Sequence, residues 1–338
     1  MPTHAPTMRA VVQSRYGAPE DVLTISTTPR PEPEPGQVLV RMRASSVNTP
    51  DWLTVTGVPY VLRLKSGLRG PGTPVRGSDV AGVVEAVGEG VTALAPGDEV
   101  FGSLWNGNLA VKHGAFAEYT VAPASAFVPK PAGVTFEEAA ASVMSGLTAL
   151  TAMRDVGGVG EGTRVLINGA SGGVGTFAVQ IAKHLGGHVT AVCGPKNTDF
   201  VRSLGADDTI DYTATDFTRG SGKYDVILDN VLNHPPSRTA KALAPGGRLL
   251  PNSVGDTGNA VLAGLPRIAR ASLIGMGRTD VRPVHTGMGR DHLAAVAELL
   301  GTGAVKAVVD GVYPLDETPA AVARMLTHRA RGNVVITM

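Results

Sequence analysis

The sequence predicts an α/β protein in which a β-rich domain is interrupted by a doubly wound domain with a parallel sheet. Three observations lead to this fold class. Short β-branched segments between proline and glycine turns fill residues 8–130. Strand-like and helix-like segments then alternate from residue 164 onward, a rhythm typical of βαβ units. A glycine-rich turn joins the first of these strands to the helix that follows it.

The N-terminal region is expected to be a small β-domain. Its β-branched runs predict strands over residues 8–13, 37–47, 81–87 and 117–123, with turns such as PEPEPGQ and LAPGDEV between them. Strands of this length and spacing are typical of an irregular barrel or a sandwich.

The second region is expected to be a parallel sheet covered by helices. Strands are predicted over 164–169, 188–194, 224–231 and 246–254, and helices over 175–186 and 197–206. A later helix (291–303) and a final strand (332–338) do not extend the alternation, so we expect the end of the chain to fold back on the N-terminal domain. The expected boundaries are 1–133 for the first part of the catalytic domain, 134–280 for the α/β domain and 281–338 for the return.

Composition narrows the class of protein. At 338 residues, with 43% hydrophobic and 17% charged residues, the chain is long enough for two cores. A net charge of +1 argues against a nucleic-acid partner or an anionic membrane surface. One cysteine allows no disulfide within the chain, and the N-terminal residues form no apolar leader. We therefore expect a soluble cytoplasmic protein.

The glycine-rich turn INGASGGVGTF, residues 167–177, predicts a dinucleotide site. It follows a buried strand directly and opens a helix, which is the context that the fingerprint requires. Ala170 takes the first glycine position, Gly172 the second and Gly175 the third. The free amides of the helix N-terminus suit phosphate groups. The residues expected to bind the cofactor here are Ala170, Ser171, Gly172, Gly173, Val174 and Gly175.

The end of the second strand favours NADPH over NADH. An NAD site has an acidic residue about 20 positions after the glycine turn, bonded to the ribose 2′-hydroxyl. Here that strand ends at Gly194, which offers no carboxylate, and Lys196 follows as a cation for a 2′-phosphate. The alternative is that Lys196 is a solvated turn lysine. Asn230 ends the strand YDVILDN, at the edge where open α/β sheets bind ligands.

With these residues identified, the chain resembles the zinc-independent quinone oxidoreductases of the medium-chain dehydrogenase/reductase superfamily. The likeness covers nearly the whole sequence. It is carried by SVNTPDW (46–52), GSDVAGVVEAVGEGV (77–91), PGDEVFG (96–102), GAFAEY (114–119), INGASGGVGTFAVQIAKHLG (167–186), SLGADDTIDY (203–212), YDVILDNV (224–231) and ARGNVVI (330–336). The resemblance implies a GroES-like catalytic domain, a Rossmann cofactor domain, use of NADPH and a homodimer.

The resemblance also suggests which residues act. It points to Asn48 and Asp51 beside the nicotinamide and the substrate, where an asparagine amide can donate to a developing oxyanion. The alternatives are a turn-stabilising Asn48 and a buried capping Asp51. Tyr60 stands one residue away from a tyrosine that protonates the α-carbon in related enoyl reductases, and a substrate-lining or packing role is the alternative.

For the cofactor, the resemblance implies that Tyr212 lies near the adenosine phosphate, with packing as its alternative role. Two positions depart from the family pattern. Leu232 stands where relatives usually have glycine beside the nicotinamide, and Asn333 stands where a lysine is common near the phosphate.

No zinc site is expected. Zinc-dependent relatives hold the metal with a cysteine and a histidine of the catalytic domain. Ser78 takes the position of that histidine, and Asn48 lies in the region of that cysteine. The single cysteine, Cys193, ends a strand of the cofactor domain, and His113 is isolated in a loop.

The leading hypothesis is therefore an NADPH-dependent, metal-free reductase that transfers a hydride to a quinone or an α,β-unsaturated ketone. A quinone is already electrophilic, so it needs mainly proximity and orientation. One alternative is a reductase of an enoyl thioester or biosynthetic intermediate, with Tyr60 as the acid. Another is an NADPH-binding structural or RNA-associated protein, although the neutral charge and the absence of a basic run argue against RNA.

Overall fold

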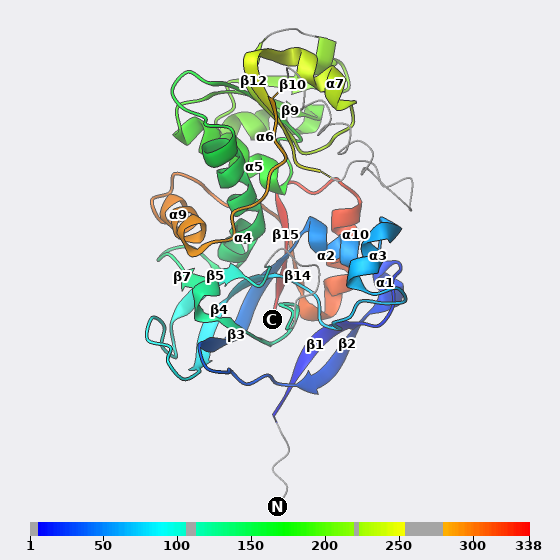
Figure 1. Ribbon diagram of the computed structural model, residues 1–338, viewed down its shortest axis with the longest axis vertical. Helices are drawn as coiled ribbons and strands as arrows, with labels where there is room; N and C mark the ends of the chain where they lie inside the picture. Colours follow the sequence, from blue (N-terminus) through cyan, green and yellow to red (C-terminus); the bar gives the residue numbers. More distant parts are fainter. Residues whose placement is uncertain (1–5, 106–112, 220–222, 254–279) are drawn as a thin grey trace, which may run out of the picture. The chain divides into compact units, whose positions relative to one another are not determined.

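The computed structural model describes residues 6–105, 113–219, 223–253 and 280–338. Contacts divide the chain into two compact units (Figure 1). The first unit holds residues Met1–Met144, Met288–Thr302 and Ala307–Met338, and the second holds Ser145–Gly287 and Gly303–Lys306. The units change after residues 144 and 287, whereas the sequence places the boundaries at 133 and 280, and helix α4 (Phe136–Leu150) carries the chain from the first unit into the second.

The first unit is the predicted β-rich domain. Its main sheet has seven strands in the order β14-β15-β3-β4-β5-β7, with β6 also paired to β3, and β1 and β2 form a separate hairpin. Its strands are β1 (Thr7–Gln13), β2 (Leu23–Pro29), β3 (Gln37–Val47), β4 (Asp79–Val87), β5 (Glu99–Ser103), β6 (Tyr119–Pro123), β7 (Phe127–Pro129), β14 (Val309–Pro314) and β15 (Asn333–Thr337).

The last strand joins the two ends of the chain. β15 pairs with β3 in antiparallel register, Val334 opposite Val47 and Thr337 opposite Ala44. The segment after the α/β domain therefore folds back on the N-terminal domain, as the sequence predicts. In Figure 1 this is the red strand β15, which pairs with the blue strand β3.

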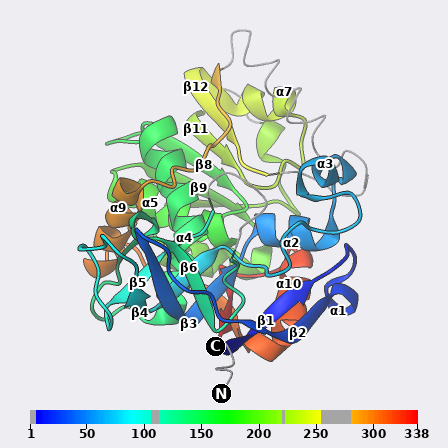
Figure 2. The same ribbon diagram turned by 60° about the horizontal axis from the view of Figure 1, so that its bottom comes forward.

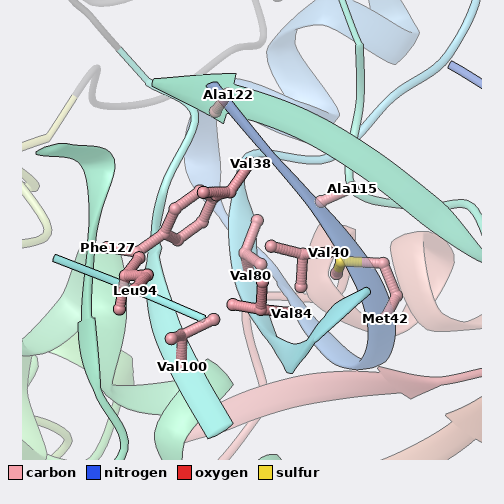
Figure 3. Packing of buried hydrophobic residues seen from close by; sticks show 10 residues of the cluster. All are labelled: Val38, Val40, Met42, Val80, Val84, Leu94, Val100, Ala115, Ala122 and Phe127. Atoms are coloured by element: carbon pink, nitrogen blue, oxygen red, sulfur yellow. The ribbon is translucent and has the colours of Figure 1, made fainter. Parts of the chain in front are cut away.

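Aliphatic side chains of β3, β4 and β5 form the core of the first unit (Figure 3). Val38, Val40 and Met42 alternate along β3 and lie almost completely buried, because alternate residues of a strand point to the same face. Phe127 of β7 fills the space beside Val38 in this core. This packing fixes β3 and β4, and thus the polar residues at the end of β3 and the start of β4.

Short helices surround the first unit's sheet. Helix α2 begins at its cap Asn48 and ends at Gly57, whose φ of 64° is a left-handed conformation that glycine adopts without strain. Helix α10 lies against α1 and α2 in both views (Figures 1 and 2). The helices are α1 (Pro19–Val22), α2 (Thr49–Thr56), η1 (Tyr60–Leu62), α3 (Arg63–Ser66), η2 (Ala124–Ala126), α9 (Arg290–Gly301), η7 (Leu315–Glu317) and α10 (Thr318–Leu326).

The second unit is the predicted doubly wound domain. Its six strands run in the order β10-β9-β8-β11-β12-β13, and all the pairings are parallel. They are β8 (Arg164–Asn168), β9 (His188–Cys193), β10 (Asp208–Asp211), β11 (Tyr224–Asp229), β12 (Leu243–Pro251) and β13 (Asp280–Val281). In chain order this is 3-2-1-4-5-6, the strand order of the Rossmann fold, so the order reverses between β8 and β11.

Helices cover this parallel sheet, and Figure 2 shows α5 beside β8 and β9. The helical segments of the unit are η3 (a π-helical turn, Thr151–Val156), α5 (Gly173–His184), η4 (Pro195–Asn197), α6 (Thr198–Ser203), η5 (Phe217–Arg219), α7 (Pro236–Thr239) and η6 (Ala240–Ala242). Each strand and helix predicted from the sequence is present, with ends that differ by a few residues. Residue 254, the last of a predicted strand, lies outside the described residues.

Candidate cofactor and catalytic sites

The glycine loop lies where the strand order of the second unit reverses. It leaves the carboxyl end of β8 and enters α5 at Gly172, which caps the helix in an extended conformation. Gly175 must be glycine for steric reasons, because a Cβ there would come within 2.2 Å of the Gly169 carbonyl oxygen. A Cβ at Gly172 would lie 3.6 Å from that same oxygen, an ordinary contact. The space beside Gly172 is therefore open to a ligand.

The start of α5 has the features of a phosphate site. The first amides of a helix have no carbonyl partner within it, and they carry partial positive charge. In α5 the Thr176 amide donates to the Gly172 carbonyl, which is the first hydrogen bond within the helix. The first turn contains no acidic residue. Ala170 is fully buried, so it supports the loop through packing. The loop fits a dinucleotide pyrophosphate.

Three predicted cofactor residues lie together at the end of β9. Gly194 caps the short helix η4, which contains Lys196. A Cβ at Gly194 would be 3.5 Å from the ring of Tyr212, so these two residues are neighbours, and the ring is half exposed. The Asn197 side chain donates to Ser171 Oγ at 3.1 Å and ties η4 to the glycine loop. The sequence did not point to Asn197, since a turn asparagine carries no signal by itself.

A network of hydrogen-bonded polar side chains lies at the carboxyl ends of β8 and β11. Asn168 donates to Asp229 Oδ1 at 2.8 Å, and the same oxygen accepts the Leu232 amide at 2.9 Å. Asn230 accepts from Asn252 at 2.8 Å, while its own Nδ2 is buried without a hydrogen-bond partner. An unpartnered donor at this edge fits a ligand that brings an acceptor. Asn168 and Asp229 were missed, although both end strands in the sequence.

Leu232 is held in an unusual backbone conformation. Its φ is 54°, in the left-handed region, and its side chain is fully buried. This conformation costs a leucine more than a glycine, which explains why glycine suits the position in relatives. Packing and the hydrogen bond to Asp229 hold the loop in place.

Asn333 belongs to the first unit, unlike the other predicted cofactor residues. It begins β15, is buried, and donates its backbone amide to the Val308 carbonyl at 2.8 Å. Asn333 and the loop residues therefore lie in different units, and the role of Asn333 near a phosphate stays a prediction.

In the first unit, Asn48 and Asp51 form the N-terminal cap of α2. The Asn48 backbone amide donates to Asp51 Oδ2 at 2.7 Å. The Asn48 side-chain amide donates to Asp79 Oδ2 at 2.7 Å and to Ser46 Oγ at 3.0 Å. These bonds direct the amide hydrogens toward the protein interior. The predicted donation by Asn48 to an oxyanion stays a prediction.

Asp79 is the centre of this network, and the sequence did not identify it as functional. It begins β4, is fully buried, and its Oδ2 accepts from Ser46 Oγ at 2.6 Å and from the Met144 amide at 3.2 Å as well as from Asn48. Its Oδ1 is buried without a partner. Burial raises the pKa of Asp79 to about 7, although these hydrogen bonds oppose the shift.

Asp51 has fewer donors and a higher pKa. Burial raises the pKa of Asp51 to about 8, the Asn48 hydrogen bond lowers it, the charge of Asp79 raises it, and the cation Arg76 lowers it. Arg76 is itself buried, which lowers its pKa to about 10, and its Nε has no hydrogen-bond partner. Asp51 therefore lies near a second buried carboxyl group and near a buried cation.

A small cavity opens beside Asp51. Its volume of about 20 Å³ is enough for one water molecule. Its lining residues are Pro50, Asp51, Thr54, Val75, Arg76, Gly77, Ser78 and Trp105. Asp51 thus contacts a polar cavity, whereas Asp79 does not line it.

Tyr60 lies outside this hydrogen-bonded network. It begins η1, and its ring is 45% exposed. The Arg63 guanidinium stacks on the ring at 4.1 Å from its centre. This environment suits a surface residue that contacts a substrate, and a role as acid stays a prediction.

The described part of the chain contains neither a cluster of metal-binding side chains nor a membrane-spanning helix. No three or more His, Cys, Asp or Glu side chains there are grouped to hold a metal ion. No helix among these same residues is long and apolar enough to cross a membrane.

Comparisons with known proteins agree with this geometry. The alcohol dehydrogenase GroES-like domain matches residues 34–132, and a family described as zinc-binding dehydrogenase matches residues 204–336. The chain is 32% identical to the chloroplast envelope quinone oxidoreductase homolog of Arabidopsis thaliana, over 97% of this chain and 98% of that protein. It is 33% identical to the trans-enoyl reductase pgmF of Aspergillus terreus, over 89% and 86%.

A solved structure has the same fold along the whole chain. The quinone oxidoreductase from Coxiella burnetii matches with a TM-score of 0.84 and 26% identity, over 98% of this chain and all of that one. Members of this superfamily are oxidoreductases that bind nicotinamide cofactors, and the glycine loop has the shape that such binding requires. The chain belongs to the quinone oxidoreductases of the medium-chain dehydrogenase/reductase superfamily.

Proposed function

We propose that this protein is an NADPH-dependent reductase that transfers a hydride to a quinone or an α,β-unsaturated ketone without a metal ion. The observation that carries the proposal is the glycine loop at the reversal of strand order, with Gly194 and Lys196 beside it where an NAD site has an acid. The family suggests the type of reaction, and the residues of this site suggest which cofactor is bound.

Each part of the second-unit site has a separate task toward NADPH. The amides at the start of α5 hold the pyrophosphate, and the open face of Gly172 lets the backbone approach it. Lys196 and Tyr212 contact the 2′-phosphate and the adenosine end. Asn230 offers its unpartnered amide at the edge of the sheet. The bound cofactor supplies the hydride.

The proposal of metal-free chemistry rests on the side chains that stand at the positions of the zinc ligands. Ser78 and Asn48 offer a hydroxyl and an amide where zinc relatives have an imidazole and a thiolate, and neither group is a good zinc ligand. Quinones and enones accept a hydride without a Lewis acid when they are well oriented. A homodimer and a cytoplasmic location stay predictions from the sequence.

A second candidate is reduction of an enoyl thioester or biosynthetic intermediate. The likeness to a trans-enoyl reductase supports it. The exposed ring of Tyr60 would be available to such a substrate. A Tyr60→Phe variant that keeps full turnover on every substrate would remove Tyr60 as the acid.

The proposal is tested by mixing the purified protein with NADPH or NADH and panels of quinones, enones and enoyl thioesters. We expect NADPH oxidation with at least one quinone or enone, slower oxidation of NADH, and no loss of rate after dialysis against a chelator. NADPH oxidation no faster than the protein-free background on every quinone and enone would refute it. Turnover confined to enoyl thioesters would select the second candidate.

A further inference from the structure

The buried carboxyl pair of the first unit has no role in the function as proposed so far. Asp51 and Asp79 are 6% and 0% exposed, and Asn48 bridges them. Its backbone amide donates to Asp51, and its side-chain amide donates to Asp79. A structural cap for α2 would need only the first of these bonds.

The two carboxyl groups have unequal surroundings. Asp79 Oδ2 accepts three hydrogen bonds, from Ser46, Asn48 and the Met144 amide, and such donors favour the ionised form. Asp51 accepts from the Asn48 amide and is otherwise in a desolvated position. Two buried carboxylates close together cannot both ionise readily. The charge therefore belongs on Asp79, and the proton belongs on Asp51.

The cavity beside Asp51 has room for one water molecule that could accept its proton. Asp51 lines the cavity together with Arg76 and Ser78, and the buried Ser78 hydroxyl has no hydrogen-bond partner in the structure. The other groups that act on this pair electrostatically are Arg76, which attracts Asp51, and Tyr16, which acts on Arg76. When Asp51 loses its proton, Arg76 is the cation that stabilises the new carboxylate.

We propose that Asp51 stores the proton that accompanies each hydride, that buried Asp79 keeps it on Asp51, and that Arg76 stabilises Asp51 after release. This inference rests on the proposed function. In each turnover the substrate carbon gains a hydride, the O–H bond of the Asp51 carboxyl breaks, and that proton passes through the cavity to the α-carbon or oxygen of the substrate. Asp51 then regains a proton from solvent by the same route. Pairs of acids whose surroundings separate their pKa values serve in this way.

The first test needs neither cofactor nor substrate. Infrared spectra of the purified protein, recorded from pH 5 to pH 9, report the C=O band of a protonated carboxyl group. We expect such a band near pH 7.5, between the raised pKa values of Asp79 (about 7) and Asp51 (about 8), its disappearance as the pH rises further, and its loss near pH 7.5 in Asp51→Asn. An absent band in the wild type, or an unchanged band in Asp51→Asn, would overturn the proposal.

The second test uses two variants with opposite effects. Asp79→Asn removes the charge that keeps the proton on Asp51, so the midpoint of the band should move down by about one pH unit. Arg76→Gln removes the attracting cation, so the midpoint should move up by a similar amount. General disruption of the fold would not shift one titration in opposite directions. Ser46→Ala, which removes one donor to Asp79 and no charge, is the milder variant if Asp79→Asn does not fold.

The same shifts should appear in turnover. The fall of kcat at high pH should follow the band, moving down in Asp79→Asn and up in Arg76→Gln. The matched controls are Asp21→Asn and Arg69→Gln, two exposed residues of the same unit. They should change neither the midpoint of the infrared band nor the pH profile of kcat. A band that shifts while the kcat profile stays fixed would refute the link to hydride transfer. A protein that reduces no substrate would refute the proposed function, whereas the infrared shifts would still establish the stored proton.

Discussion

At the residue scale, the proposed choice of NADPH rests on Lys196. It follows Gly194, lies on the exposed side of η4, and shares this corner with Tyr212 and the glycine loop. A lysine that pairs with a 2′-phosphate forms a charge-assisted contact, and NADH has no such phosphate.

Lys196→Ala should therefore weaken NADPH binding by about tenfold to a hundredfold and leave NADH binding nearly unchanged. Titration of both cofactors against both proteins by calorimetry measures this. Lys241→Ala, which removes another exposed lysine of the same unit, is the control and should alter neither affinity. A wild type that binds NADH as tightly as NADPH would show that Gly194 and Lys196 do not select the cofactor.

At the scale of elements, the β8–loop–α5 turn contains two glycines with different duties. At Gly175 a side chain would collide with the loop backbone, because a Cβ there would lie only 2.2 Å from the Gly169 carbonyl oxygen. At Gly172 the nearest atom to an added Cβ would be 3.6 Å away, and the extended backbone there is one that any residue can adopt. Gly175 is needed to form the turn, and Gly172 leaves space that the proposed phosphate site would use.

Alanine at each position should separate these duties. Gly175→Ala should lower the melting temperature of the protein without cofactor, because the loop must move away from α5. Gly172→Ala should melt like the wild type and bind NADPH at least about tenfold more weakly, since its methyl group fills the space of the phosphate. Scanning fluorimetry with and without NADPH distinguishes the two. Equal NADPH affinity in Gly172→Ala and wild type would place the phosphates elsewhere.

At the scale of the whole molecule, the two units respond to pH in opposite ways. In the first unit, folding raises the pKa of Asp51 to about 8 and that of Asp79 to about 7, from 3.8. Between about pH 4 and pH 8 the folded unit then holds protons that the unfolded chain has lost, so its stability falls as the pH rises. In the second unit, arginine partners lower the pKa of Asp225 and Asp280, so that contribution is lost only as the pH falls below about 4.

Calorimetric melting from pH 3 to pH 9 should therefore show one transition that weakens toward high pH. Asp51→Asn, which mimics the protonated carboxyl group, should flatten that trend and be more stable than the wild type at pH 8. The salt bridges of the second unit are partly exposed, so their contribution is small and is screened by salt. A first-unit transition that strengthens from pH 5 to pH 8 would contradict the raised pKa values.

The sequence alone determined the local features of this protein. The period-2 and βαβ patterns predicted the strands and helices, because hydrophobic periodicity is a property of neighbouring residues. The glycine turn, Gly194 and Lys196 could be identified as parts of one site, because parallel strands bring their carboxyl ends to the same edge of a sheet. Asn48 and Asp51 were brought together by the resemblance to the family, on the motif SVNTPDW.

Only the tertiary structure decided which distant residues share an environment. Asp79 lies 31 positions from Asn48, and Met144 lies 65 positions from Asp79, yet both bonds meet at one carboxyl oxygen. Arg76 looks like a surface residue in the sequence and is 5% exposed in the fold. Burial changes the charge state of a carboxyl group only after distant strands have enclosed it. The composition of a short segment does not record which strands will pack there, so the proton-holding pair became visible only in three dimensions.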